Sequence, residues 1–285
     1  MIASGLIMLL GGWQWPMTNF EIETSFGEPS NESVSPGVEL LSDSDEVLSA
    51  EEGELVFAAR APQSRGDIPY ALGSFVVLEH EGDFRSLYAH LDRQVELDDS
   101  SVGEGATLGG VGRTGLRGGN TLGFRIIDVQ RHAYVNPLSI LPKLEDESAP
   151  QIEEVELSRG DRRIWSSSAD EAESEAVTEG RAQLSARIYD GDGGGVYRGE
   201  GTPHSVSVLM NGEQEFSVTL ETLVLADGEM RFSKRGTGAG MYGADERMQL
   251  GSYDVTPGTN LLEIIAVDHA GNEQVMSYEI LGETE

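Results

Sequence analysis

Short apolar runs separated by frequent glycine are the clearest pattern in the first half of the chain. Short runs bounded by turn residues are typical of strands. No segment keeps the 3.6-residue apolar repeat of a helix. The pattern predicts an all-β protein, and in this half a tight antiparallel sheet. The predicted strand segments are residues 55–58, 74–78, 85–88 and 122–129.

Longer alternating runs mark the second half of the chain. Strands of that length, joined by turns, are typical of a β-sandwich. Between them, residues 166–180 are acidic, rich in serine and nearly free of large apolar side chains. Such a segment buries too little apolar surface to offset its ordering entropy, so we expect a solvated loop there. The runs are residues 183–188, 205–209, 216–220 and 261–267.

The length of the chain, 285 residues, favours two domains. Residues 143–150 (KLEDESAP) form a polar, acidic stretch that ends in proline, which is the composition of a linker. We therefore expect one domain at 13–142 and a β-sandwich at 151–285. Residues 1–12 are apolar but too short to span a bilayer. We expect an export-signal remnant or a short anchor there, with a buried first strand as the alternative.

The charge of the chain narrows the classes of partner. Lys and Arg number 19 against 50 Asp and Glu, so the formal net charge is -31. This charge repels phosphate backbones and anionic lipid heads, and we expect neither nucleic-acid binding nor a membrane-surface role. High charge also favours solubility without implying any partner. The absence of cysteine excludes disulfides and thiolate metal sites.

The segment Gly73–Leu91 (GSFVVLEHEGDFRSLYAHL) resembles the central hairpin of the lysostaphin-type, or LytM-like, zinc endopeptidases, which cut peptide cross-links in bacterial cell walls. Its most specific part is Tyr88–Leu91. The resemblance implies a LytM-like antiparallel β-sheet domain of the duplicated hybrid motif type over residues 13–142, and an extracytoplasmic location. Further similar segments are Trp15–Pro16, Ser25–Gly27, Val102–Gly105, Leu108–Gly115 and Val135–Leu138.

The resemblance also indicates where zinc would bind. It implies ligands from a His-x-Gly-x-Asp segment and from the last histidine of a His-x-His strand, with two more histidines assisting the attacking water. Ser35 and Glu39 stand at the first pair of positions, Thr121 and Gly123 at the second, and His90 at the remaining one. Catalytic zinc requires about three protein ligands, and Glu39 is the only residual candidate. We therefore expect no metal, no other cofactor and no catalytic residues.

The leading hypothesis is a non-catalytic cell-envelope protein whose degenerate cleft binds a peptide or a protein. The expected partners are a cell-wall peptide or an envelope protein such as a hydrolase, which the chain would regulate or scaffold. Gly123 opens space on the sheet, and the Thr121 hydroxyl can hydrogen-bond a main chain. His90 is either a residual ligand contact or a histidine hydrogen-bonded near the sheet surface. The expected ligand groove is lined by Tyr88, His90, Thr121 and Gly123.

Two alternative functions stay open. One is an active zinc endopeptidase whose ligands have moved to other residues of the first domain. The other is a surface adhesion protein that binds through the β-sandwich, and Ala266–Asn272 resembles the last strand and turn of bacterial immunoglobulin-like modules. Residues 190–195 (DGDGGG) offer oxygen ligands for calcium but lack the later bidentate acid of an EF-hand loop, which favours a hairpin turn. Candidates for relocated zinc ligands are His80, Asp83, Asp128 and His132.

Overall fold

The structure is a computed structural model, and it divides into two compact units. The first contains the described residues up to Glu21 together with Glu39–Pro142. The second contains Ile22–Val38 together with the described residues from Lys143 onward. The structure describes residues 12–30, 33–42, 46–61, 71–92, 100–116, 120–167, 176–191, 196–226, 229–232, 241–243 and 245–284.

Three predicted features lie partly outside the described residues. They are the apolar segment 1–12, the acidic loop 166–180 and the turn at 190–195. Within the ranges that the structure describes, no helix is long and apolar enough to cross a membrane.

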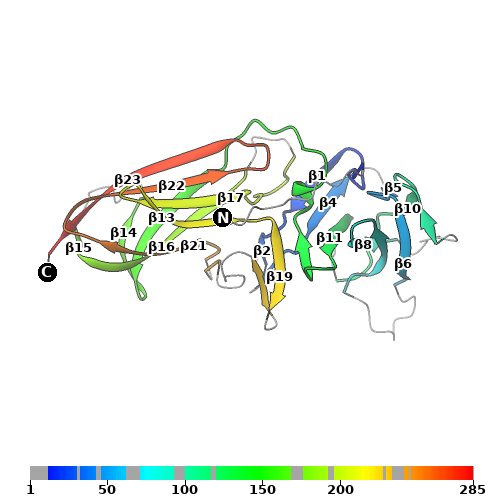
Figure 1. The fold of residues 1–285 in the computed structure, drawn as a ribbon, viewed down its shortest axis with the longest axis horizontal. Coiled ribbons are helices and arrows are strands. Elements are labelled where there is room, and N and C mark those ends of the chain that lie inside the picture. Colours follow the sequence, from blue (N-terminus) through cyan, green and yellow to red (C-terminus); the bar gives the residue numbers. More distant parts are fainter. Residues whose placement is uncertain are drawn as a thin grey trace. The chain divides into compact units, whose positions relative to one another are not determined.

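The first unit is an antiparallel β-sheet, with strands in the order β12-β11-β8-β7-β6-β9. Strand β4 also pairs with β11, and β5 pairs with β10 in a separate two-stranded sheet. The prediction of an all-β fold is confirmed (Figure 1). The elements are β1 (Phe20–Thr24), β4 (Val38–Ser42), β5 (Glu46–Leu48), β6 (Gly53–Ala59), β7 (Ser74–His80), β8 (Phe84–Leu91), β9 (Ser101–Val102), β10 (Thr107–Gly110), β11 (Thr121–Asp128), β12 (Ala133–Val135) and the 3-10 turn η1 (Pro137–Ser139).

One face of this sheet forms the core of the first unit. Tyr88 of β8 lies opposite Phe124 of β11, and their ring centroids are 5.3 Å apart. Val76 of β7 pairs with Tyr88 from the other side. All three side chains are fully buried. Each such apolar side chain stabilises the fold by about 1.5–3 kcal/mol relative to an exposed position.

The second unit contains two sheets, in the orders β14-β13-β16-β21 and β15-β23-β22-β17-β18 (Figure 1). Strand β13 packs against β22 and β23, and apolar residues of both sheets are fully buried, among them Leu157, Leu184 and Ile264. This is a two-layer β-sandwich; its immunoglobulin-like character stays a prediction. Its strands are β13 (Gln151–Arg159), β14 (Arg162–Ser166), β15 (Val177–Thr178), β16 (Gly180–Tyr189), β17 (Ser205–Met210), β18 (Glu213–Thr219), β21 (Met248–Val255), β22 (Gly258–Val267) and β23 (Glu273–Glu283).

The segment Ile22–Val38 is built into the second unit. Ile22 forms a parallel bridge with Tyr197, and the Thr202 hydroxyl donates to the Phe26 carbonyl at 2.7 Å. The rings of Phe26 and Phe232 meet edge to face. Sequence reasoning missed this arrangement, because the partners are about 170 to 200 positions away and no local pattern connects them. Four short strands complete this part of the fold: β2 (Pro29–Ser30), β3 (Ser33–Val34), β19 (Thr222–Ala226) and β20 (Glu229–Phe232).

Candidate functional site

Three of the sequence-predicted site residues converge on one point of the first unit. A Cβ atom built on Gly123 of β11 would lie 3.1 Å from Cδ2 of His90 and 3.2 Å from Oε1 of Glu39. Strands β4 and β8 both pair with β11, and Gly123 lies opposite Ala89. The sheet topology therefore brings Glu39, His90 and Gly123 together from three strands.

His90 owes its position to an unusual backbone conformation. Its φ of 64° lies in the left-handed region, which costs a residue with a side chain on the order of 1 kcal/mol or more. Two backbone hydrogen bonds of 2.9 Å hold it there, from its N–H to the Leu72 carbonyl and from the Gly112 N–H to its own carbonyl. This conformation turns the imidazole toward Gly123.

The imidazole of His90 is also oriented by a hydrogen bond. Its Nδ1 lies 3.0 Å from the carbonyl oxygen of Thr114. Because a carbonyl only accepts, Nδ1 is the donor, and in the neutral ring Nε2 is left as an acceptor. His90 is buried and hydrogen-bonded. It nevertheless keeps one nitrogen able to accept a hydrogen bond.

Thr121, at the start of β11, contributes a buried hydroxyl. Its side chain is 1% exposed, and Oγ1 has no hydrogen-bond partner in the part of the chain that the structure describes. A buried polar group left in this state costs about 1–3 kcal/mol. Glu39 is also buried, at 6% exposure. The site thus offers a carboxylate, an imidazole nitrogen and a hydroxyl, with little solvent access to any of them.

Tyr88 lies in the core and does not line a groove with these residues. It is fully buried against Phe124, and its hydroxyl accepts hydrogen bonds from the Ala50 N–H at 2.8 Å and from the Ser86 hydroxyl at 3.0 Å. Burial raises the pKa of this hydroxyl. Gly123 is on the opposite face, because its Cβ would meet that of Ala89 at 3.3 Å. In a regular strand, residues two apart point to the same face, so Tyr88 and His90 would share a face. The left-handed backbone of His90 interrupts this alternation.

Ser35 belongs to the segment that is built into the second unit, and its contacts are local. Its hydroxyl donates to the Gly37 carbonyl at 3.0 Å, and its backbone carbonyl accepts from the Gly27 N–H at 2.8 Å. The hydroxyl of Ser35, which stands at the first ligand position of the family pattern, therefore takes part in a local turn.

Three of the four candidates for relocated zinc ligands take part in local contacts. Burial lowers the pKa of His80, whose Nδ1 bonds the Glu52 carbonyl and whose ring contacts Trp13. Asp128 accepts from the backbone and the guanidinium of Arg131, at 2.9 and 2.6 Å. Asp83 accepts from Gln130 at 2.5 Å, and His132 has a positive φ of 49°.

The residues around Gly123 do not fit a catalytic zinc ion. Glu39 and His90 supply two donors of the types that zinc prefers, and the neutral hydroxyl of Thr121 is a poor third. Within the described ranges, the one group of three or more metal-ligating side chains with closely spaced donors is Asp146, Asp190 and Asp268, in the second unit. The described residues around Gly123 thus supply two of the roughly three donors that a catalytic zinc ion requires.

This antiparallel sheet, with residues from three strands meeting beside the Tyr-Ala-His-Leu motif, has the arrangement expected of a cell-wall peptidase domain of the LytM type. Sequence comparison agrees, because residues 33–137 match peptidase family M23. The first domain of the chain is therefore a LytM-type member of that family. A second family, which carries no description, matches residues 149–281.

Curated relatives match the same part of the chain. The murein hydrolase activator NlpD of Escherichia coli (strain K12) is 28% identical over 132 residues, which are 46% of this chain and 31% of the relative. The outer membrane antigenic lipoprotein B of Haemophilus influenzae is 26% identical over 132 residues, 46% of this chain and 29% of the relative. The chain thus spans about a third of the length of these relatives.

Solved structures show a partial likeness. A zinc-containing peptidase from Vibrio cholerae has 20% identity and a TM-score of 0.38, covering 47% of this chain and 41% of its own. Lysostaphin from Staphylococcus simulans has 13% identity and a TM-score of 0.39, covering 93% of this chain and 90% of its own. The family assignment rests on the sequence matches and not on these scores.

Proposed function

We propose that this protein is a non-catalytic LytM-like protein of the cell envelope that regulates or scaffolds a cell-wall hydrolase. Two of its curated relatives are a murein hydrolase activator and an outer membrane lipoprotein, and both match its LytM-type domain. Those names support an extracytoplasmic location and a protein partner. The large negative charge is compatible with both.

The close contact at Gly123 is the observation that carries the proposal. The family pattern puts a histidine at this position, but a Cβ here would already meet His90, Glu39 and Ala89 within 3.1–3.3 Å. A side chain as large as histidine therefore requires its neighbours to move. The space that a zinc ligand would use is occupied by the imidazole of His90. Chemistry that depends on acidifying a metal-bound water has no support at this site.

The burial of the site favours a protein partner over a peptide bound in a groove. Glu39, His90 and Thr121 are each less than a tenth exposed. A cell-wall peptide could hydrogen-bond the Thr121 hydroxyl and Nε2 of His90 only if the surrounding loops opened. A protein that docks on the surface needs no such opening. We therefore place regulation of a hydrolase first and binding of a cell-wall peptide second.

The experiment uses the full-length protein, purified without chelators. We expect elemental analysis to find well below one zinc per chain, and we expect no release of soluble fragments from cell-wall sacculi by the protein alone. Murein hydrolases of the same organism are then assayed on sacculi with and without the protein, and at least one should become faster. Stoichiometric zinc with chelator-sensitive release by the protein alone would show an active peptidase instead. Zinc-free protein that stimulates no hydrolase would overturn the regulatory role.

A further inference from the structure

The two sheets of the second unit differ sharply in charge. Strands β13, β14 and β16 of one sheet carry five arginines. Strands β17, β18, β22 and β23 of the other sheet carry neither lysine nor arginine. These four strands contain six glutamates, Glu213, Glu215, Glu263, Glu273, Glu279 and Glu283.

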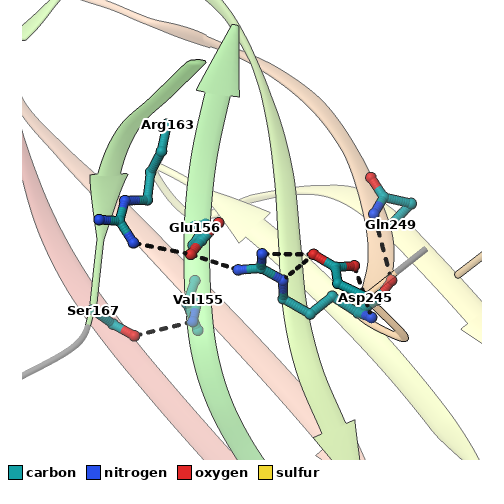
Figure 2. Close-up of polar contacts among 7 residues, drawn as sticks. Val155, Glu156, Arg163, Ser167, Asp245 and Gln249 are labelled. Carbon is teal, nitrogen blue, oxygen red and sulfur yellow. Dashed lines mark hydrogen bonds and ion pairs between the residues drawn. The ribbon is translucent and has the colours of Figure 1, made fainter. Parts of the chain in front are cut away.

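Charges on the arginine-bearing sheet are paired within that sheet and its flanking loops. Glu156 accepts from Arg163 at 3.4 Å and from Arg247 at 2.5 Å, and Figure 2 shows Glu156 between its partners. Arg187 pairs with Glu153 at 3.1 Å. Most of the arginines on these strands thus have an acidic or carbonyl partner within the second unit.

The outward face of β22 and β23 is different. These strands run side by side over ten register pairs (Figure 1). Their inward residues, such as Ile264 and Ile280, are fully buried, whereas alternate residues of β23 are exposed. We call the outward residues of the two strands the acidic face. They are Thr259, Leu261, Glu263, Ile265 and Val267 of β22, and Glu273, Val275, Ser277, Glu279 and Leu281 of β23.

Aliphatic side chains are exposed between the carboxylates of this face. Val275 is 43% exposed, Leu281 45% and Leu261 38%. In register, Val275 lies beside Ile265, and Leu261 beside Glu279. Apolar and acidic positions are therefore interspersed on the outward face of the two strands. An exposed apolar surface rimmed by polar groups is typical of an interaction site.

Strands β22 and β23 supply no cation to the carboxylates of the acidic face. Among the described residues, the side chains of Glu263, Glu273 and Glu279 form no ion pair, in contrast to Glu153 and Glu156 of the other sheet. Like charges on neighbouring strands repel one another, and an opposite charge supplied by a binding partner would reduce this repulsion.

We propose that the acidic face is a docking surface for a basic polypeptide segment that presents lysine or arginine together with aliphatic residues on one side. Charge complementarity selects this occupant, because the face carries three carboxylates that form no ion pair among the described residues, and its two strands carry no base. A second copy of the chain would bring carboxylates against carboxylates. An extended segment matches the face, since its alternate side chains repeat at about 7 Å, as those of β23 do. The inference is independent of the function proposed for the first domain.

The test uses the full-length protein and three fluorescent peptides of about ten residues, the length of the β22–β23 register. One repeats lysine-serine-valine-serine, so that lysine and valine share one side of the extended peptide. The second has the same composition in two blocks, and the third has glutamate in place of lysine. Binding is followed by fluorescence anisotropy at low and at moderate salt. We expect the first peptide to bind most tightly, the acidic one not to bind, and salt to weaken the complex.

Three variants locate the site. Glu263→Gln with Glu279→Gln should weaken binding about tenfold, and Val275→Thr should weaken it by a smaller factor. The matched control, Glu145→Gln with Glu147→Gln, removes the same charge from two exposed residues outside the face, and it should change affinity less than about twofold. Circular dichroism checks that each variant is folded.

Other outcomes would overturn the proposal. Equal losses in the control pair, or equal binding of the block peptide, would mean that net charge alone attracts the peptide. No binding by the wild-type protein would mean that the face is not a docking surface. Neither result would affect the stimulation of hydrolases, which is measured separately on sacculi.

Discussion

His90 and Gly123 face each other across β8 and β11, with only 3.1 Å between Cδ2 of the histidine and the place where a Cβ of residue 123 would lie. The close approach exists because the left-handed backbone of His90 turns its ring toward β11. Glycine at position 123 permits this close approach because it has no Cβ atom. This relationship leads to the first prediction.

Substitution of Gly123 should destabilise the protein in proportion to side-chain size. Gly123→Ala should cost about 1 kcal/mol, and Gly123→His or Gly123→Trp more, because overpacking a filled site forces neighbours to shift. Denaturant unfolding measures the series. A stable Gly123→His variant that binds zinc tightly would contradict the crowding seen here. In combination with Ser35→His, Glu39→Asp and Thr121→His, zinc binding should rise only if the four side chains converge.

Replacing the hydroxyl of Thr121 by a methyl group should leave stability unchanged or raise it by about 1 kcal/mol. Oγ1 is buried without a partner among the described residues, and Thr121→Val removes that unmet polar group while keeping the shape. Thr114→Val is the matched control, because that hydroxyl donates to Leu91 and accepts from the Ser74 N–H. The control should lose about 1–3 kcal/mol in chemical denaturation. If Thr121→Val lost more stability than Thr114→Val, the Thr121 hydroxyl would be the one that is hydrogen-bonded.

Tyr88→Phe should lower stability by about 1–2 kcal/mol, because the Ala50 N–H and the Ser86 hydroxyl lose a buried acceptor. It should leave the stimulation of hydrolases unchanged, since Tyr88 lies in the core. Both are measurable on one preparation, by thermal unfolding and by the sacculus assay. A stable variant with lost stimulation would mean that Tyr88 contacts the partner.

His269 should make the protein sensitive to mild acid. Burial, together with His204 and Lys143, lowers its pKa to about 3. The pKa of this histidine in the unfolded chain is about 6.5. Between pH 6.5 and about 3 the unfolded chain therefore binds a proton that the folded chain does not bind, and the free energy of unfolding falls as the pH drops through this range. The slope for this group is at most about 1.4 kcal/mol per pH unit. His269→Gln should flatten the fall over that window. Parallel curves for the wild-type protein and this variant would contradict the prediction.

A fragment of residues 143–285 should be less stable than the second unit in the full-length protein. It lacks Ile22–Val38, and so it loses the bridge at Tyr197, the hydrogen bond of Thr202 and the ring contact of Phe232. Adding a peptide of residues 22–38 should raise the melting temperature, whereas a scrambled peptide should not. A fragment that melts at the same temperature with or without the peptide would show that the segment is dispensable.

Local pattern was enough to identify some of the strands, although it missed others such as β13, β21 and β23. The run at 122–129 became β11, and the runs at 205–209 and 261–267 fall within β17 and β22. A two-residue repeat depends on the chain alone, because burying one face of a strand requires nothing else. The motif at Tyr88–Leu91 likewise indicated the family without any knowledge of contacts.

Long-range contacts decided what the pattern could not. The direction of His90 depends on two backbone hydrogen bonds, one that its N–H donates to the Leu72 carbonyl and one that its carbonyl accepts from the Gly112 N–H, about 20 positions away on either side. Strand alternation alone would place His90 on the same face as Tyr88. Segment 22–38 is held by residues about 170 to 200 positions later. The acidic character of one sandwich face emerges only when strands pair and show which glutamates have an arginine beside them. Secondary structure follows from neighbours in sequence, whereas side-chain direction and charge pairing follow from neighbours in space.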